Sequence, residues 1–261
     1  HNPESIQRAP QLQLHLDRCI GCGRCVVACE LGGQHLDAGV RRYDREVCVG
    51  CGRCAAECFS GALELSGREM TVAEVIAEVS KDEPYYRHSG GGVTFSGGEP
   101  VLHTDFLRQA LIACGEQRLH VAVDTAGHYP WRLLASLLPH LDLVLYDVKL
   151  LDPALHRRFI GNDGSQSHAN LASLAMTKCP FIVRTPVIGG VNDSEEVIDG
   201  IARRIGAFDN LLYYELLPYH ALGQDKSASL GLTPDNTFTT PGAARMQALA
   251  DVARRHVADV R

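Results

Sequence analysis

The architecture expected for this chain is set by the stretch Ser89-Gly90-Gly91-Gly92-Val93-Thr94-Phe95-Ser96-Gly97-Gly98-Glu99-Pro100. Its centre, Val93 to Ser96, has the apolar, β-branched and aromatic residues of a short buried strand, and glycines bound it on both sides. Because Gly97 and Gly98 have no Cβ, a ligand can approach and hydrogen-bond to the backbone there. A glycine pair by itself is usually only a turn. The carboxyl ends of parallel strands, however, are where α/β sheets and barrels place their ligands.

Strands and helices alternate from this stretch onward. Apolar strands are expected at residues 93–96, 119–125, 141–149, 181–187 and 211–217. Amphipathic helices are expected near residues 104–116, 131–138, 153–159, 167–177, 194–205 and 243–257, with a loop before the last one. An earlier helix follows a capping box formed by Thr71 and Glu74. Near-continuous apolar strands joined by helices indicate an α/β fold with a five-stranded parallel sheet and right-handed crossovers.

Polar residues fall where these strands stop. They are Asp124 and Thr125, Asp147 and Lys149, Arg184, and His220. Charged side chains are costly to bury without a partner. Each of these residues alone is equally well explained as a surface charge or a satisfied helix cap. Together on one rim they indicate a polar ligand that has both carboxylate and hydroxyl groups.

The composition is that of an ordinary globular protein. The 261 residues are 45% hydrophobic and 21% charged, which fits one large domain or one domain with a small companion. The net charge of −6 argues against nucleic acid or an anionic membrane as a partner. No run of about 18 apolar residues suggests a transmembrane helix, so we expect a cytoplasmic protein. The start, His1-Asn2-Pro3-Glu4-Ser5, is neither an initiator methionine nor a signal peptide, so we expect it to lie within a longer protein.

Eight of the ten cysteines form an internal repeat. Cys19-Ile20-Gly21-Cys22-Gly23-Arg24-Cys25 returns at Cys48 as Cys-Val-Gly-Cys-Gly-Arg-Cys, and each copy has a further cysteine, Cys29 or Cys58. Three cysteines at this spacing hold one face of a cubane cluster, and in two-cluster ferredoxins the fourth ligates the other cluster. We therefore assign Cys19, Cys22, Cys25 and Cys58 to one [4Fe–4S] cluster, and Cys48, Cys51, Cys54 and Cys29 to a second.

The alternative for these cysteines is a pair of zinc sites. Zinc takes four ligands, usually in two separated pairs, and triplets this close make a poor tetrahedral cage. Without a secretory signal, the dense spacing also favours metal over disulfides. Glu30 and Phe59 stand where a proline usually follows the fourth cysteine, which removes no ligand. Cys114 and Cys179 lie outside the repeat and are expected to be small buried apolar residues.

From Tyr85 to Lys226 the chain resembles the activating enzymes of glycyl radical enzymes, which belong to the radical S-adenosylmethionine (SAM) superfamily. The resemblance rests on the motif at 89–100, Asp-Thr-Ala-Gly at 124–127, Asp-Val-Lys at 147–149, and Leu-Leu-Pro-Tyr-His at 216–220 followed by Gly223 and Lys226. The first five residues match the segment after the third radical-cluster cysteine. The cysteine repeat is similar to the insert in activases of newer glycyl radical enzymes, which the plain pyruvate formate-lyase activase lacks.

The resemblance implies both a fold and a site. The fold is a partial (β/α)6 radical SAM barrel missing its first strand at 65–261, an inserted two-[4Fe–4S] ferredoxin-like domain at 17–64, and a remnant of the radical SAM cluster loop at 1–16. Gly97, Gly98 and Glu99 would hold the methionine end of SAM. Asp147, Lys149, Arg184 and His220 would contact its ribose, its carboxylate and their surroundings. Asp124, Thr125, Asp147 and the backbone of Leu145 would bind a monovalent cation.

The implied reaction forms a glycyl radical on a partner glycyl radical enzyme. A reduced [4Fe–4S] cluster gives one electron to SAM, and the 5′-deoxyadenosyl radical that results removes a hydrogen atom from a glycine Cα of the partner. The two clusters of the insert would relay electrons from an external donor such as flavodoxin or ferredoxin. The family's Cys-x-x-x-Cys-x-x-Cys loop, which binds the third, SAM-ligating cluster, is absent from this sequence. We therefore expect those cysteines upstream of His1 and expect this chain alone to be inactive.

Two other functions fit part of the sequence. An electron-transfer ferredoxin-like module fused to a SAM-binding, non-catalytic barrel would account for the missing cysteines. A radical SAM enzyme acting on a small molecule would need a closed substrate pocket instead of an open protein-binding face. The sequence does not name the partner, and glycyl radical lyases, dehydratases, decarboxylases and addition enzymes are all candidates.

Overall fold

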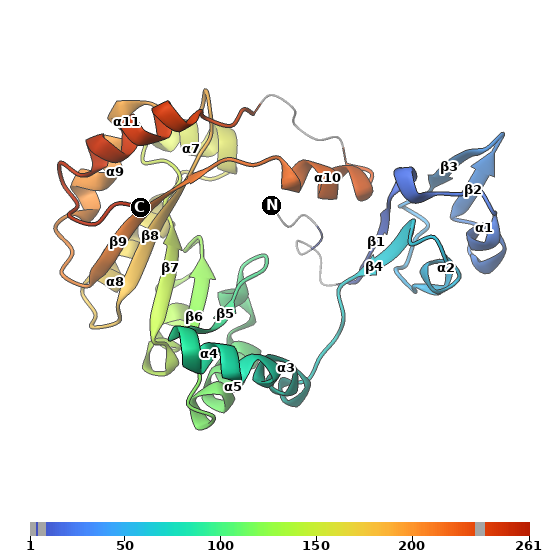
Figure 1. The fold of residues 1–261 in the computed structure, drawn as a ribbon, viewed down its shortest axis with the longest axis horizontal. Helices are drawn as coiled ribbons and strands as arrows, with labels where there is room; N and C mark the ends of the chain where they lie inside the picture. Colours follow the sequence, from blue (N-terminus) through green and yellow to red (C-terminus); the bar gives the residue numbers. More distant parts are fainter. Residues whose placement is uncertain (1–3, 5–8, 233–237) are drawn as a thin grey trace. The chain divides into compact units, whose positions relative to one another are not determined.

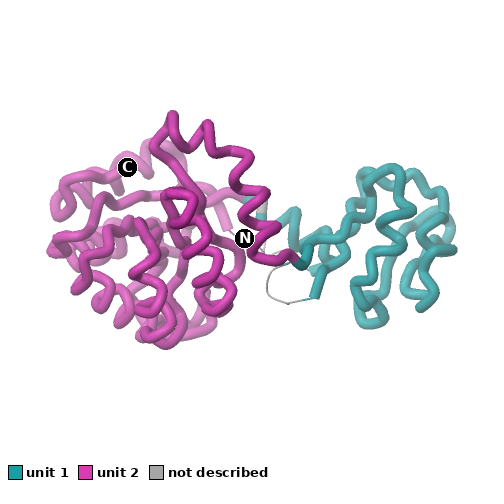
Figure 2. Tube along the Cα trace, turned by 90° about the horizontal axis from the view of Figure 1, so that it is seen from below, with its two compact units in different colours: residues 1–69, 221–237 teal, residues 70–220, 238–261 magenta. Residues whose placement is uncertain are grey.

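The structure is a computed structural model that describes residue 4, residues 9–232 and residues 238–261. The chain divides into two compact units (Figure 2), one of residues 1–69 with 221–237 and one of residues 70–220 with 238–261. The motif predicted at residues 1–5 lies outside the described residues except for Glu4. Each unit is a separate piece of architecture, and each holds one of the two groups of candidate site residues.

The larger unit is built on a five-stranded parallel sheet, as the sequence predicted. Its strands follow one another in chain order (Figure 1): β5 (Gly92–Phe95), β6 (His120–Thr125), β7 (Leu143–Asp147), β8 (Phe181–Val187) and β9 (Leu211–Pro218). Every neighbouring pair is parallel. All five carboxyl ends therefore lie at one edge of the sheet, where the polar residues of the sequence were found.

The two faces of this sheet differ in how well they are covered. Along β7, Val144 and Tyr146 are buried, whereas Leu145 and Asp147 are only half-buried. Because side chains alternate across a strand, the first pair points into the core and the second onto a more open face. Arg184 lies opposite Asp147 in the register of β7 and β8, so it shares that open face.

The helices of the larger unit supply the rest of its core. They are α3 (Val72–Val79), α4 (Glu83–Ser89), α5 (Thr104–Glu116), α6 (Trp131–Ala135), α7 (Pro153–Ile160), α8 (Ser165–Ala175), α9 (Glu195–Ile205) and α11 (Ala243–Ala253). Leu111, Leu174 and Ile201 pack with strand residues in one apolar cluster. Helix α11 contacts both α9 and β9, as Figure 1 shows. No helix in the described ranges is long and apolar enough to span a bilayer.

The smaller unit contains two similar halves. Strand β1 (Gln11–Leu14) pairs antiparallel with β4 (Leu63–Ser66), and β2 (Gln34–Asp37) pairs antiparallel with β3 (Val40–Tyr43). Helices α1 (Arg24–Ala28) and α2 (Arg53–Ala56) begin after Gly23 and Gly52, which share a left-handed φ of 74°. Glycine adopts that conformation at little cost, so Cys-Gly-Arg-Cys forms the same turn twice. Helix α10 (Leu222–Ser229) also belongs to this unit.

The local signals in the sequence were correct in one place and wrong in two. The predicted capping box of Thr71 and Glu74 is present and begins α3. The loop expected after the last strand contains α10, whose apolar residues show almost no helical periodicity. The helix expected at 131–138 ends at Ala135 and is followed by a 3-10 turn from Leu138 to His140. Pro139 explains this end, because it has no N–H to donate to the Ala135 carbonyl four residues earlier and its ring would clash with that carbonyl.

Candidate cofactor-binding sites

Four charged side chains meet at the carboxyl ends of β6 and β7, and one of them, Arg184, comes from the middle of β8 and not from its end as the sequence predicted. The Arg184 guanidinium donates to Asp124 Oδ1 and to Asp147 Oδ1, the latter at 2.9 Å. Lys149 Nζ donates to Asp147 Oδ2 at 2.9 Å, and Ser96 Oγ, just after β5, donates to Asp124 Oδ2 at 3.1 Å. Two carboxylates and two cations make this Arg184 network neutral as a whole. Side chains in or just after four neighbouring strands thus form one connected set of hydrogen bonds.

Arg184 is the centre of the network and is mostly buried. Its side chain is 17% exposed, and both aspartates are similarly covered. Burial lowers the pKa of Arg184, but the two aspartates together raise it by more. The guanidinium therefore stays charged. Removing it would leave two carboxylates side by side without their cation, a change that costs roughly 3–5 kcal/mol for a buried pair.

A second network holds the Gly-Gly-Glu-Pro turn. The Glu99 carboxylate accepts hydrogen bonds from Thr125 Oγ at 2.8 Å and from the backbone N–H groups of Ala126 at 3.1 Å and Val101 at 3.3 Å. Burial raises the pKa of Glu99, against the lowering effect of these hydrogen bonds. The carboxylate thus ties the turn after β5 to the end of β6. Among the described residues other than Gly97 and its two chain neighbours, nothing lies within 4 Å of where a Cβ on Gly97 would be.

The loop after β6 is held from behind by buried polar groups. The hydroxyls of Thr125 and Tyr129 lie 3.0 Å apart, and the Gly127 N–H donates to Thr125 Oγ at 3.0 Å. Asn170 Nδ2 donates to the carbonyls of Gly127 at 2.8 Å and Tyr129 at 2.7 Å. A Cβ on Gly127 would lie 1.7 Å from the Tyr146 hydroxyl, so this position needs glycine. The end of β6 is therefore rigidly positioned.

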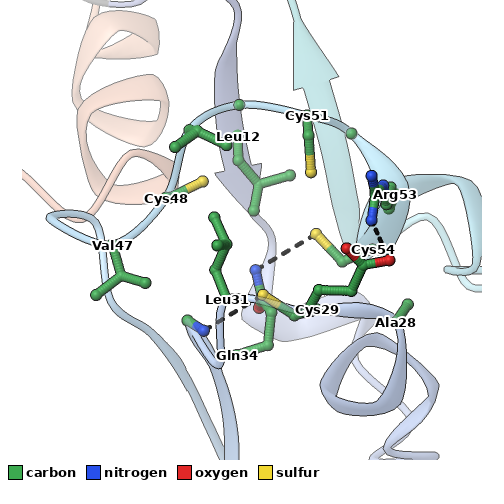
Figure 3. A pocket seen from close by; sticks show the side chains of 15 residues that line it. Leu12, Ala28, Cys29, Leu31, Gln34, Val47, Cys48, Cys51, Arg53 and Cys54 are labelled. Atoms are coloured by element: carbon green, nitrogen blue, oxygen red, sulfur yellow. Dashed lines mark hydrogen bonds and ion pairs between the residues drawn. The ribbon is translucent and has the colours of Figure 1, made fainter.

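In the smaller unit, the four cysteines assigned to the second cluster line one pocket. Cys29, Cys48, Cys51 and Cys54 surround a cavity of about 210 Å³ (Figure 3). Burial raises the pKa of Cys54, and the other three cysteines raise it further. Four thiolates repel one another unless a cationic group lies among them. The cavity is many times larger than the space that one water needs, so its size suits a group of several heavy atoms.

A single-ion site is a poorer fit to these cysteines. Among the described residues, no group of three or more His, Cys, Asp or Glu side chains could hold one metal ion. A zinc ion would draw its thiolates to about 2.3 Å from one centre. A cubane instead spreads four thiolates over four irons. The donor set and the size of the cavity therefore fit a [4Fe–4S] cluster.

Cysteine exposure repeats between the two halves. In each triplet the first cysteine is half-buried, the second exposed and the third buried, while Cys29 and Cys58 are both half-buried. Cys29 Sγ accepts a hydrogen bond from the Gly33 N–H at 3.3 Å, and Cys58 Sγ accepts one from the Leu63 N–H at 3.3 Å. Burial raises the pKa of Cys58, but hydrogen bonds from Ser60 and nearby amides lower it by more. Both halves thus present similar thiolates.

The residues that replace the usual proline join the two halves. Arg53 forms an ion pair with Glu30. Arg24, its counterpart in the repeat, lies 4.5 Å from the centre of the Phe59 ring and pairs with Glu57 at 2.8 Å. Each arginine therefore contacts the residue that follows the fourth cysteine of the other half. Exposed pairs contribute little stability singly, so their main effect is to match one half to the other.

Three further residues of the sequence analysis lie outside these groups. His220 is exposed directly after β9, and neither network described above is built on it. Cys114 is fully buried in α5, as predicted. Cys179 is half-buried, and burial raises the pKa of its thiol to about 11.

Comparison with known proteins identifies the family. Residues 47–200 match the radical SAM superfamily and residues 18–62 match the 4Fe-4S dicluster domain. The chain is 36% identical to the indoleacetate decarboxylase activating enzyme of Tractidigestivibacter scatoligenes over 98% of this chain and 84% of that protein. It is 37% identical to the (2S)-3-sulfopropanediol sulfolyase activating enzyme of Bilophila wadsworthia, over 88% of this chain and 78% of that protein. The chain belongs to the radical SAM activating enzymes of glycyl radical enzymes.

A solved structure agrees with this membership. A domain of the pyruvate-formate lyase-activating enzyme from Bacteroides vulgatus is 28% identical, with a TM-score of 0.56 over 66% of this chain and 98% of that domain. This chain has a radical SAM α/β fold and a ferredoxin-like 4Fe–4S domain, and these two domains support iron–sulfur clusters and SAM as its cofactors. These predictions are confirmed. The roles of individual site residues stay predictions.

Sequence reasoning missed several residues that shape the activase's sites. Ser96 ends the strand predicted at 93–96, and a hydroxyl at the carboxyl end of a strand was a signal that could have been used. Tyr129 and Asn170 carry no local signal, because their partners come from distant parts of the chain. Gln34, which donates to Cys54 Sγ at 3.4 Å, was missed for the same reason.

Cys29→Ala should remove one cluster and leave the other. Because Cys29 shares a pocket with the second triplet, we expect anaerobic reconstitution of this variant to give about four irons per chain where the unchanged chain gives about eight. Iron and sulfide content, normalised to protein by amino-acid analysis, measures this. Cys179→Ala is the matched control and should keep the full content. Retention of about eight irons per chain in Cys29→Ala would contradict the assignment of Cys29 as a cluster ligand.

Glu99→Gln should destabilise the larger unit by roughly 1–3 kcal/mol, since the amide would aim its NH₂ group at other donors. In the folded protein, burial raises the pKa of Glu99 above its ordinary value of 4.5. The free energy of unfolding of the wild type therefore falls as pH rises from about 4.5 through the raised pKa. The glutamine of the variant does not titrate. The difference in the free energy of unfolding between wild type and variant should therefore shrink as pH rises. Urea unfolding from about pH 4 to 8 measures the deficit. Glu116→Gln, on an exposed part of α5, is the control, and a deficit that grows with pH would refute the raised pKa.

Proposed function

We propose that this chain activates a partner glycyl radical enzyme, with SAM bound at the carboxyl ends of β5 to β8. The main support is the Arg184 network, which gathers Asp124, Asp147 and Lys149 at one edge and connects through Ser96 to the end of β5. SAM carries ribose hydroxyls, an amino group and a carboxylate. Carboxylates and cations held at one edge can pair with all of these groups.

Each part of SAM has a proposed partner. The backbone of Gly97 and Gly98 would face the methionine amino group, and Glu99 would act by holding that turn in place through Thr125. Asp147 and Lys149 would meet the ribose and the carboxylate, with Arg184 between the aspartates and His220 at the rim. When bound, SAM and a reduced cluster would supply the one-electron cleavage that yields the 5′-deoxyadenosyl radical.

The monovalent cation has weaker support than SAM. The proposed ligands are Asp124, Thr125, Asp147 and the carbonyl of Leu145. All four oxygens of the two carboxylates already accept hydrogen bonds. A cation would therefore have to displace part of the hold of Arg184 or Lys149, unless it binds only with the carboxylate of SAM.

The cysteine repeat is proposed to hold two [4Fe–4S] clusters that relay electrons. The pocket of Cys29, Cys48, Cys51 and Cys54 supports one of them, and the matching exposure of Cys19, Cys22, Cys25 and Cys58 supports the other. We propose residues 17–64 as this ferredoxin-like insert and residues 65–261 as a partial (β/α)6 barrel without its first strand. Residues 1–16 would continue the loop of the SAM-ligating cluster.

The partners follow from the family. The protein substrate would be a glycyl radical enzyme, and the electron donor an external flavodoxin or ferredoxin. Relatives named for a decarboxylase and a sulfolyase differ in their partners, so the family membership alone leaves the partner's reaction open. A cytoplasmic location stays a prediction.

Radical formation is the direct test of this function. The full-length protein, reconstituted anaerobically, is mixed with SAM, a strong reductant and a panel of glycyl radical enzymes. We expect 5′-deoxyadenosine and, with the correct partner, the electron paramagnetic resonance (EPR) doublet of a glycyl radical. SAM binding without any 5′-deoxyadenosine would reject this function and favour an electron-transfer module fused to a non-catalytic barrel.

Lys149→Ala separates a ligand contact from a purely structural ion pair. A charge-assisted hydrogen bond to the SAM carboxylate is worth roughly 1.5–3 kcal/mol, so we expect about 10- to 150-fold weaker SAM binding by the full-length variant. Calorimetry of SAM binding and of thermal unfolding measures both effects. Lys81→Ala is the control, because exposed Lys81 pairs with exposed Glu78 away from the Arg184 network. An unchanged Kd with a lowered midpoint would reject the ligand role.

A further inference from the structure

Gln34 is a buried amide in a pocket lined by cysteines. It is the first residue of β2 and is 3% exposed. Its Nε2 donates to Cys54 Sγ at 3.4 Å, as the dashed line in Figure 3 marks. Cys54 is one of the four cysteines around the 210 Å³ cavity. One thiolate of this set thus receives a side-chain hydrogen bond.

Arg41 determines which way the Gln34 amide points. It is 5% exposed, and its guanidinium donates to Gln34 Oε1, to the His35 carbonyl at 2.6 Å and to the Arg42 carbonyl at 2.5 Å. A guanidinium can only donate, so it must face the amide oxygen. The amide NH₂ group is therefore the end that faces Cys54. Arg41 acts as the positioning residue for this hydrogen bond.

The other half of the unit has leucines in the equivalent places. Gln34 and Leu63 each open a strand and lie at corresponding positions of the repeat. The registers of β2 with β3 and of β1 with β4 make Arg41 the counterpart of Leu12. Leu63 and Leu12 are both buried. The two halves thus differ by a buried polar pair that stands on one side only.

Stability does not explain this difference. Burying an amide and a guanidinium costs free energy that two well-packed leucines would not cost, even when every hydrogen bond is made. The hydrogen bond to the Cys54 thiolate does have a consequence for a cluster. Reduction adds one electron to the cluster and its thiolates, so a donor to sulfur stabilises the reduced state more than the oxidised one.

We infer that Gln34, held by Arg41, raises the reduction potential of the cluster bound by Cys29, Cys48, Cys51 and Cys54 above that of the other cluster. This inference rests on the proposed two-cluster function of the repeat. The step is the one-electron reduction of a [4Fe–4S] cluster by the external donor, with no bond made or broken. The cluster beside Gln34 is then the first of the two to be reduced, and electrons reside there before they move on.

The test is a potentiometric titration of the reconstituted full chain followed by EPR. We expect two one-electron waves. The variant Gln34→Leu has the leucine that the other half has at this position. At a given potential, the ratio of reduced to oxidised cluster in the upper wave should fall about tenfold. This corresponds to a reduction potential that is lower by ~59 mV for a one-electron couple. The lower wave should not move. Arg41 keeps its two carbonyl acceptors in this variant, which favours folding.

Two further variants sharpen the result. Gln34→Glu keeps a partner for Arg41 but offers the thiolate no donor, so the upper wave should again move down. Gln11→Leu makes the same change on β1, where the side chain donates to the Ala9 carbonyl, and should move neither wave. Iron content separates the two possible failures. Fewer than about eight irons in the unchanged chain would contradict the two-cluster proposal, whereas full content with an unmoved upper wave in both Gln34 variants would overturn the role of Gln34.

Discussion

The pairing of one guanidinium with two aspartates is the interaction on which the larger unit's candidate site depends. Asp124 and Asp147 belong to neighbouring strands, and at the carboxyl edge their charges would repel. Arg184, from the next strand, bonds to both and remains charged because they surround it. The pairing therefore holds the polar side chains of three neighbouring strands in fixed positions relative to one another. A site built this way is preorganised, since its polar groups are positioned before any ligand arrives.

The smaller unit also brings like charges together, because four cysteines surround one cavity and each carries a negative charge when ionised. Burial and the three other cysteines around the cavity raise the pKa of Cys54, and Arg53, which lines the same pocket, is already paired with Glu30. In the proposed two-cluster unit, the irons of the cluster would supply the compensating charge. Cluster binding and folding of the unit would then be coupled, because the thiolates would lose their stabilisation without the cluster.

The parts of the structure that sequence could predict are those governed by neighbours along the chain. The strand at 181–187 and the capping box at Thr71 depend on residues within a few positions, and both were predicted correctly. Arg184 was predicted to contact a ligand, but its aspartates lie 37 and 60 residues away and meet it only through the register of the sheet. The link from Arg41 to Gln34 likewise depends on hairpin register. Helix α10 was missed for the opposite reason, since its pattern is weak even locally.

The exposure of the network suggests which of its members a ligand can recruit. Lys149 is 34% exposed, whereas its partner Asp147 is 19% exposed. If Lys149 turned from Asp147 toward a ligand carboxylate, Asp147 would still hold Arg184 through its other oxygen. If Arg184 turned instead, both aspartates would lose their shared cation. The lysine is thus the cation that can change partners at the smaller cost, and the arginine is the one that must stay.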